Sequence, residues 1–235
     1  MKQQKILIKN IPALLWGEPS EHCILAVHGK GSHKADTVIQ ILAEIAASKN
    51  YCLLSFDLPK HGNRQQDTTP CDIWHDTADL QAVYDYAKTK YQKISLWACS
   101  LGAFFSLAAL GNQSVNIVKA FFLSPVVDLQ NLTENMMQWA DITPEQLQKA
   151  GKIPTNFGET LDWEYYTYLK EHPIGKWQTE TCILYGEKDN LAPQNVIDNF
   201  CRKYGCKLQI MPQGEHFFHT EEQLAVYRNW LKEVL

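Results

Sequence analysis

Residues 96–105, with the sequence LWACSLGAFF, decide how the rest of the chain is interpreted. An apolar run, predicted as a strand, ends at Ser100, and a helix of small and apolar residues is predicted to begin at once. A turn this tight needs small residues two positions before and after the serine, and Ala98 and Gly102 occupy them. The pattern favours a nucleophile elbow, with Ser100 at a helix N-terminus that stabilises negative charge. The backbone N–H of Leu101 would then point at an oxyanion.

Two features of this stretch leave alternatives open. The common motif has glycine at both small positions, and Ala98 replaces the first, so an ordinary turn with Ser100 as a helix cap is the competing interpretation. Cys99 lies beside the serine and is the other candidate nucleophile. Because neighbouring residues on a strand point to opposite faces, we expect Cys99 to be a packing residue.

The loop at residues 27–32, VHGKGS, follows another apolar run. Its two glycines permit close approach of the backbone to a ligand. If Ser100 is a nucleophile, the N–H of Lys30 is the expected second oxyanion donor. Glycines suit a simple strand-to-helix turn equally well, so this motif is a weak signal by itself.

Asp189 and His216 are the candidate acid and base. Asp189 follows a predicted strand at 181–185, and His216 follows another at 207–211. Together with Ser100, they occur in the order nucleophile, acid, base, and each comes just after a predicted parallel strand. Open α/β sheets place their sites at the carboxyl ends of such strands, so we expect the three side chains to meet there.

Each of these assignments has a competitor. Asp128 follows the strand predicted at 118–123, but four residues separate it from that strand. Asp189 lies in a Gly-x-x-Asp turn tied to its strand, and is therefore preferred. His219 is a second histidine in the loop of His216, which is preferred because Gly214 lets the chain turn it toward the sheet edge.

Short apolar runs alternate with helical patterns along the chain, which indicates an α/β fold with a mostly parallel sheet covered on both faces. The predicted strands are 5–8, 11–16, 23–27, 51–56, 93–98, 118–123, 181–185 and 207–211, the first two forming an antiparallel pair. The predicted helices are 35–48, 72–91, 101–110, 193–204 and one that begins at a capping box, 220–223. The helix at 72–91 is expected to bury Trp74, Ala78, Leu80, Val83, Tyr84 and Ala87.

The alternation stops between Pro125 and Trp177, where no strand-like run occurs. Helical signals appear instead, such as a capping box at Thr143 followed by proline. We expect residues 126–177 to form a helical cap inserted into a core made of residues 1–125 and 178–235. Aromatic and methionine side chains in the cap are expected to form mainly its own core, and a few of them a pocket for substrate. These are Met136, Met137, Trp139, Phe157, Trp163, Tyr165, Tyr166 and Tyr168.

Taken together, these motifs resemble the α/β-hydrolase superfamily over nearly the whole chain. The loop at 28–31 resembles its oxyanion loop, and DLPKHGN at 57–63 resembles its D-x-P-G-H-G-x segment. The inserted helices resemble the lids of bacterial carboxylesterases and of monoacylglycerol-lipase-like members. Lys60, where the family has glycine, and Arg64, where a small residue is common, depart from the pattern in a structural loop.

The resemblance implies a serine hydrolase that cleaves a carboxylic ester of a small or medium acyl group through an acyl-enzyme. Ser100, His216 and Asp189 would be catalytic, and Lys30 and Leu101 would form the oxyanion hole. The expected partner is a small-molecule ester, and no metal or organic cofactor is needed. A thioesterase, an amidase or peptidase, and a non-catalytic binding protein on the same scaffold are the alternatives.

Composition bears on the partners and the cellular location expected of the protein. The chain has 235 residues and a net charge of −4, which gives no support for nucleic acid as a partner. No apolar run is long enough to span a bilayer. Seven cysteines without a C-x-x-C pair or an export signal favour reduced thiols and a cytoplasmic location. The sequence leaves the oligomeric state open.

Overall fold

The structure, a computed structural model, describes residues 1–111 and 116–235. The strands are β1 (Gln3–Ile8), β2 (Ile11–Trp16), β3 (His22–Val27), β4 (Cys52–Phe56), β5 (Lys93–Cys99), β6 (Ile117–Leu123), β7 (Lys152–Pro154), β8 (Thr160–Asp162), β9 (Thr181–Gly186) and β10 (Lys207–Met211). The α-helices are α1 (Thr37–Ser48), α2 (Ile73–Lys90), α3 (Leu101–Leu110), α4 (Leu129–Trp139), α5 (Pro144–Ala150), α6 (Trp163–Glu171), α7 (Gln194–Tyr204) and α8 (Glu221–Val234). A single 3₁₀ turn, η1, covers Gly62–Arg64.

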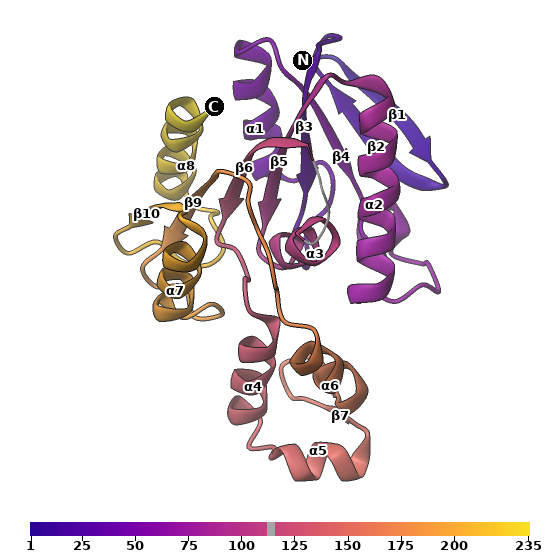
Figure 1. Cartoon of the computed structure of the whole chain (residues 1–235), viewed down its shortest axis with the longest axis vertical. Helices are drawn as coiled ribbons and strands as arrows, with labels where there is room; N and C mark the ends of the chain where they lie inside the picture. The colour runs from indigo at the N-terminus through magenta and orange to yellow at the C-terminus, as the bar shows by residue number, and fades with distance from the viewer. Residues whose placement is uncertain (112–115) are drawn as a thin grey trace.

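Eight of the strands form one sheet in the order β1-β2-β4-β3-β5-β6-β9-β10 (Figure 1). The pairs β1–β2 and β2–β4 are antiparallel, and all the others are parallel. The central strands β3 and β4 are almost wholly buried, as continuous apolar runs in a covered parallel sheet should be. The predicted mostly parallel sheet and its antiparallel opening pair are confirmed.

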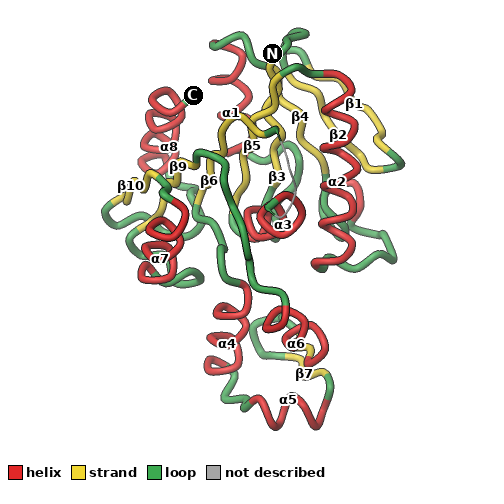
Figure 2. The backbone as a smooth tube through the Cα atoms, viewed as in Figure 1, coloured by secondary structure: helices red, strands yellow, loops and turns green. Residues whose placement is uncertain are grey.

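Helices cover both faces of the sheet (Figure 2). On one face α1 packs against α8, and the Tyr227 hydroxyl donates a hydrogen bond to the Val38 carbonyl at 3.1 Å. On the other face α2, α3 and α7 pack over the larger apolar core. Capping boxes at Thr143 and Thr220 begin α5 and α8, as the sequence predicts.

Two of the core positions predicted for α2 are wrong. Trp74 is 43% exposed and Ala78 is also exposed, while Ile73 and Asp76 are buried. Ile73 and Asp76 share one helical face with Leu80, Val83 and Ala87, whereas Trp74 and Ala78 lie on another face. Trp74 instead contacts the rings of Tyr165 and Tyr168 on α6, at centroid distances of 5.5 and 5.0 Å.

The segment between β6 and β9 extends away from the sheet and contains α4, α5 and α6 (Figure 1). The prediction that it holds no strands is wrong, because β7 and β8 pair there as a short antiparallel hairpin. Each strand has only three residues, which is too short for an alternating pattern to be detected. Leu161 of β8 joins a small apolar cluster made with Met137, Leu147 and Tyr166.

The seven cysteines are all free thiols. Within the two described ranges, 1–111 and 116–235, no helix combines the length and the apolar character that crossing a bilayer requires.

Asp76 is a buried carboxyl group in the first turn of α2. It is fully buried, and neither oxygen has a hydrogen bond of good geometry from the described residues. Burial raises its pKa to about 8, and weaker contacts with the Cys71 thiol and the Asp72 backbone offset only part of this effect. The folded protein therefore holds a proton on Asp76 that the unfolded chain releases at much lower pH.

This difference predicts a pH-dependent effect of Asp76→Asn. The folded-state pKa is raised, so the wild type loses stability as pH rises from about 4 to about 8, and little thereafter. The variant lacks this loss, so at pH 8 its free energy of unfolding should exceed that of the wild type by on the order of a few kcal/mol. Urea unfolding at pH 5 and pH 8 measures the gain. Asp85→Asn is the control, because that exposed carboxyl on α2 has a lowered pKa through Lys88 and should show no gain. An equal effect of Asp76→Asn at both pH values would contradict the prediction.

Candidate active site

Ser100 lies in the turn between β5 and α3 with φ 50° and ψ −122°, a conformation that non-glycine residues rarely adopt. Hydrogen bonds on both sides hold this turn. The Ser100 N–H donates to the Leu123 carbonyl at 3.2 Å, and the Ser100 carbonyl accepts from the N–H groups of Ala103 and Val126, each at 3.0 Å. Strain of this kind persists only where the surroundings over-determine it, and it is typical of functional sites.

The turn is also in close contact with the loop that follows β3. A Cβ atom on Gly102 would lie 2.4 Å from the His28 carbonyl oxygen, and one on Gly29 would lie 2.9 Å from Ser100 Cβ. Glycine is therefore required at both positions. Ala98, the departure from the common motif, is fully buried within β5 and leaves the turn intact.

The three residues expected to meet do meet. Ser100 Oγ lies 2.8 Å from His216 Nε2, and His216 Nδ1 lies 2.6 Å from Asp189 Oδ2. A neutral imidazole that donates from Nδ1 to the carboxylate accepts from the serine hydroxyl at Nε2. The three side chains therefore form one hydrogen-bonded chain, from Ser100 through His216 to Asp189.

Asp189 is held rigidly for this contact. Its side chain is fully buried, and its Oδ1 accepts hydrogen bonds from the N–H groups of Leu191 and Ala192 at 2.9 and 3.0 Å. The turn of Asp189 packs against the loop of His216, because the Lys188 N–H donates to the Gly214 carbonyl at 2.7 Å. Asp189 and His216 are thus positioned by one pair of neighbouring loops.

The competing residues lie elsewhere. Asp128 caps α4, where its side chain accepts from the Asn131 N–H at 2.9 Å. His219 is exposed, and its Nδ1 lies 2.8 Å from the carbonyl of Phe217. Cys99 packs against the core beneath α1 and α8, and burial raises its pKa to about 12, so its thiol stays protonated at neutral pH.

The loop at 28–31 is shaped by two histidines. His28 Nδ1–H donates to the Gly29 carbonyl at 2.7 Å, and its Nε2 accepts from the Leu58 N–H at 3.1 Å. Burial lowers the pKa of His28 to about 4, so the ring is neutral. His61 Nε2 accepts from the Gly31 N–H at 3.0 Å. These contacts fix the carbonyl and N–H directions of the loop.

Lys30 and Leu101 are the two backbone donors expected to hold an oxyanion. Among the residues that the structure describes, no acceptor bonds to the N–H of either one. Both residues line the same cavity as Ser100. Their N–H groups are therefore free to donate, as an oxyanion hole at these two residues would require.

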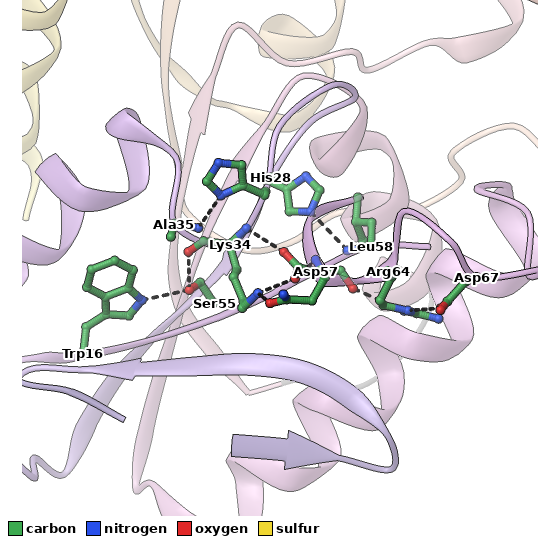
Figure 3. Close-up of polar contacts among 11 residues, drawn as sticks. Trp16, His28, Lys34, Ala35, Ser55, Asp57, Leu58, Arg64 and Asp67 are labelled. Carbon is green, nitrogen blue, oxygen red and sulfur yellow. Dashed lines mark hydrogen bonds and ion pairs between the residues drawn. The ribbon is translucent and has the colours of Figure 1, made fainter. Parts of the chain in front are cut away.

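Asp57 anchors the 57–63 segment beneath this loop, as Figure 3 shows. It is fully buried and forms an ion pair with Lys34, whose backbone N–H also donates to it at 2.9 Å. The Asn63 N–H donates to its second oxygen at 2.9 Å. Arg64, the departure from the family pattern, reaches the Asp57 carbonyl at 3.2 Å and pairs with Asp67 and Asp79. The departure thus adds ion pairs to a structural loop.

A cavity of about 910 Å³ opens beside Ser100, between the sheet and the inserted segment. Its inner wall is mainly apolar, and aromatic and charged side chains line the remainder. The apolar and aromatic lining includes Leu101, Phe105, Val126, Leu129, Leu132, Met136, Trp139, Phe157, Leu161, Tyr165 and Leu191. Of the aromatic side chains predicted for the segment, Trp139, Phe157 and Tyr165 therefore line the cavity, whereas Tyr166 is buried in the segment's own core.

Sequence reasoning missed several residues of this region. Trp74 lines the cavity, although helical periodicity assigned it to the core. Glu159 forms an ion pair with Lys30 across the cavity, from a loop 129 residues away. Neither the position of Trp74 nor the contact of Glu159 can be predicted from the local sequence pattern. His61 could have been found, because it stands in the segment that resembles the family motif.

Comparisons with known proteins agree with this architecture. Est1E from Butyrivibrio proteoclasticus has a similar structure, with a TM-score of 0.78 at 20% identity over 99% of this chain and 97% of that one. Mouse alpha/beta hydrolase domain-containing protein 10 gives 0.77 at 12% identity, over 100% and 98%. The thioesterase domain from the curacin biosynthetic pathway gives 0.62 at 15% identity, over 98% and 99%.

The chain has the α/β-hydrolase fold. No protein-family model matches the sequence, and no curated protein matches it. At these identities the similar structures define the fold, and the chemistry has to be argued from the side chains of the site.

The contact between Gly102 and the 28–31 loop predicts an unusual effect of Gly102→Ala. Alanine in place of glycine usually stabilises a helix, by about 0.5–1 kcal/mol. Here the new Cβ would lie 2.4 Å from the His28 carbonyl and 2.7 Å from that of Val27, so the variant should lose stability, by about 1–3 kcal/mol. Urea unfolding measures whether the free energy of unfolding falls or rises in the variant. A more stable Gly102→Ala protein would show that the two loops do not pack as described.

Proposed function

We propose that this protein is a serine hydrolase that cleaves carboxylic esters of small or medium acyl groups through an acyl-enzyme. The observation that carries the proposal is the hydrogen-bonded chain from Ser100 through His216 to Asp189 at the wall of the large cavity. A buried carboxylate behind a histidine, with a serine in front, is the arrangement that activates a hydroxyl for attack on a carbonyl carbon.

In the proposed mechanism, His216 Nε2 takes the proton of Ser100 as Oγ attacks the ester carbonyl. Asp189 keeps the proton of the imidazole on Nδ1 and stabilises the imidazolium that forms. The N–H groups of Lys30 and Leu101 hold the oxyanion of the tetrahedral intermediate. The imidazolium then protonates the leaving alcohol, and water attacks the acyl-enzyme in a second cycle with the same roles.

Thioesters are the second candidate substrate class, because a thioesterase domain is among the similar folds. Amides would be cleaved by the same mechanism, but their leaving amine depends more strongly on protonation than an alcohol does. A non-catalytic binding protein is the rival from another class. The hydrogen-bonded chain behind Ser100 argues against it, because a binding protein needs neither a base nor a buried acid behind a serine.

The proposal predicts that Ser100→Ala abolishes ester hydrolysis and leaves the fold intact. Loss of the nucleophile should lower kcat by several orders of magnitude. The assay is hydrolysis of p-nitrophenyl esters of increasing acyl length, together with labelling of the folded protein by a fluorophosphonate. Cys99→Ala is the control, and it should retain labelling because the thiol of Cys99 packs in the core. Turnover near the wild-type rate in folded Ser100→Ala would refute the assignment, and failure of wild type to label would favour the binding protein.

The assignment of Asp189 as the acid leads to a second prediction. Asp189→Asn should lower kcat by orders of magnitude, because the amide favours the wrong tautomer of His216. Asp128→Asn should act mainly on the start of α4 and change kcat far less. Both are measured as kcat at saturating substrate, with circular dichroism to check folding. A larger loss in Asp128→Asn would move the acid to Asp128 and leave Ser100 and His216 in their roles.

A further inference from the structure

In the cavity beside Ser100, negatively charged side chains outnumber positively charged ones. Four carboxylates and two lysines line it. The carboxylates are Asp72, Glu159, Asp162 and Glu164, and the lysines are Lys30 and Lys152. The wall therefore carries an excess of negative charge on the path that a substrate takes to the serine.

Both lysines are already paired with carboxylates of the inserted segment. Lys30 forms an ion pair with Glu159, and Lys152 forms one with Asp162 at 2.8 Å. Neither is therefore a free cation for an anionic substrate. Of the other two carboxylates, Asp72 contacts His75 and Glu164 forms no ion pair with the described residues, so neither has a lysine partner.

The two remaining carboxylates come from different helices at the cavity wall. Asp72 caps α2, where its Oδ1 accepts a hydrogen bond from the His75 N–H at 2.9 Å and also lies 2.7 Å from His75 Nδ1, so its partner is a histidine and not a lysine. Glu164 is exposed in the first turn of α6, and no ion pair joins it to another side chain in the described ranges. The neighbouring polar groups on the wall, Cys71 and Tyr165, stay neutral because burial raises the pKa of each.

Aromatic rings accompany these carboxylates. Trp74 and Tyr165 lie 5.5 Å apart between α2 and α6, and Trp139 and Phe157 lie 6.2 Å apart. Trp74, Trp139 and Phe157 are each more than 40% exposed, although all three line the cavity. Exposed aromatic rings in a cavity wall that also carries carboxylates without a lysine partner are surroundings that stabilise an alkylammonium group, through the ring quadrupole and through charge.

We infer that the site prefers esters that carry an ammonium group on an apolar body, accepts neutral esters less well and rejects anionic ones. This inference rests on the proposed function and names its substrate class. It also disfavours thioesters carried on phosphate-bearing thiols, because their charge would enter a wall whose lysines are occupied. Glu164 is the residue that the geometry assigns to this selection.

The test compares three p-nitrophenyl esters with the same acyl chain, ending in trimethylammonium, in its neutral isostere tert-butyl, or in sulfonate. The remote ends leave the reactivity of the carbonyl unchanged. We expect kcat/KM to fall in that order, with the cationic ester about tenfold or more above the anionic one at low salt. The ratio should shrink in about 0.5 M salt, where the Debye length is a few ångströms.

Glu164→Gln should reduce the ratio of cationic to anionic kcat/KM by about threefold. Glu171→Gln is the matched control, because Glu171 is an exposed glutamate at the other end of α6 and does not line the cavity. Equal rates for the three esters, or a ratio that Glu164→Gln leaves unchanged, would overturn the inference while the proposed function stands.

A binding measurement separates the two proposals. If wild type hydrolyses none of the esters, the proposed function fails, and calorimetric binding of the same three esters to Ser100→Ala still tests the selection. The cationic ester should bind most tightly there and the anionic ester least. Any other order would overturn the inference independently of catalysis.

Discussion

The strained turn at Ser100 is the constraint on which the rest of the site depends. With φ at 50°, the serine is held between β5 and α3 by backbone hydrogen bonds to β6 and to the segment that follows it. Such a conformation costs on the order of 1–3 kcal/mol, which the surrounding sheet has to supply. The same turn needs Gly102 against the His28 carbonyl, so β3, β5 and β6 must keep their register for the serine to be presented at all.

That constraint explains why fold and candidate site could be predicted together. The sharp turn needs small residues at fixed spacing around Ser100, and continuous apolar strands need covering helices, so both leave local signals. Asp189 and His216 were predictable because the carboxyl ends of parallel strands converge on one edge of the sheet. Their mutual distances were not, since the contact of the Asp189 turn with the Gly214 loop depends on how two separate connections pack.

The errors arise where tertiary contacts decide the outcome. Helical periodicity placed Trp74 in the core, but the first turn of α2 extends toward α6, where the indole meets Tyr165. The hairpin of β7 and β8 was missed because three-residue strands carry no measurable period. Asp76 occupies a core position that apolar patterning would never assign to a carboxyl group. These features lie at or near the side of the cavity that the inserted segment closes.

The sheet and the inserted segment contribute different kinds of residues to the site. The sheet supplies Ser100, His216, Asp189 and the backbone donors, all on connections that hydrogen bonds fix in place. The inserted segment supplies most of the cavity's charge and exposed aromatic surface, on short elements with a small core of their own. Chemistry that needs sub-ångström placement belongs on the rigid part, whereas recognition of charge tolerates looser geometry because Coulomb energy falls slowly with distance. Under the proposed function, changes in the inserted segment would therefore alter which substrate reaches Ser100 while the hydrogen-bonded chain behind it stays the same.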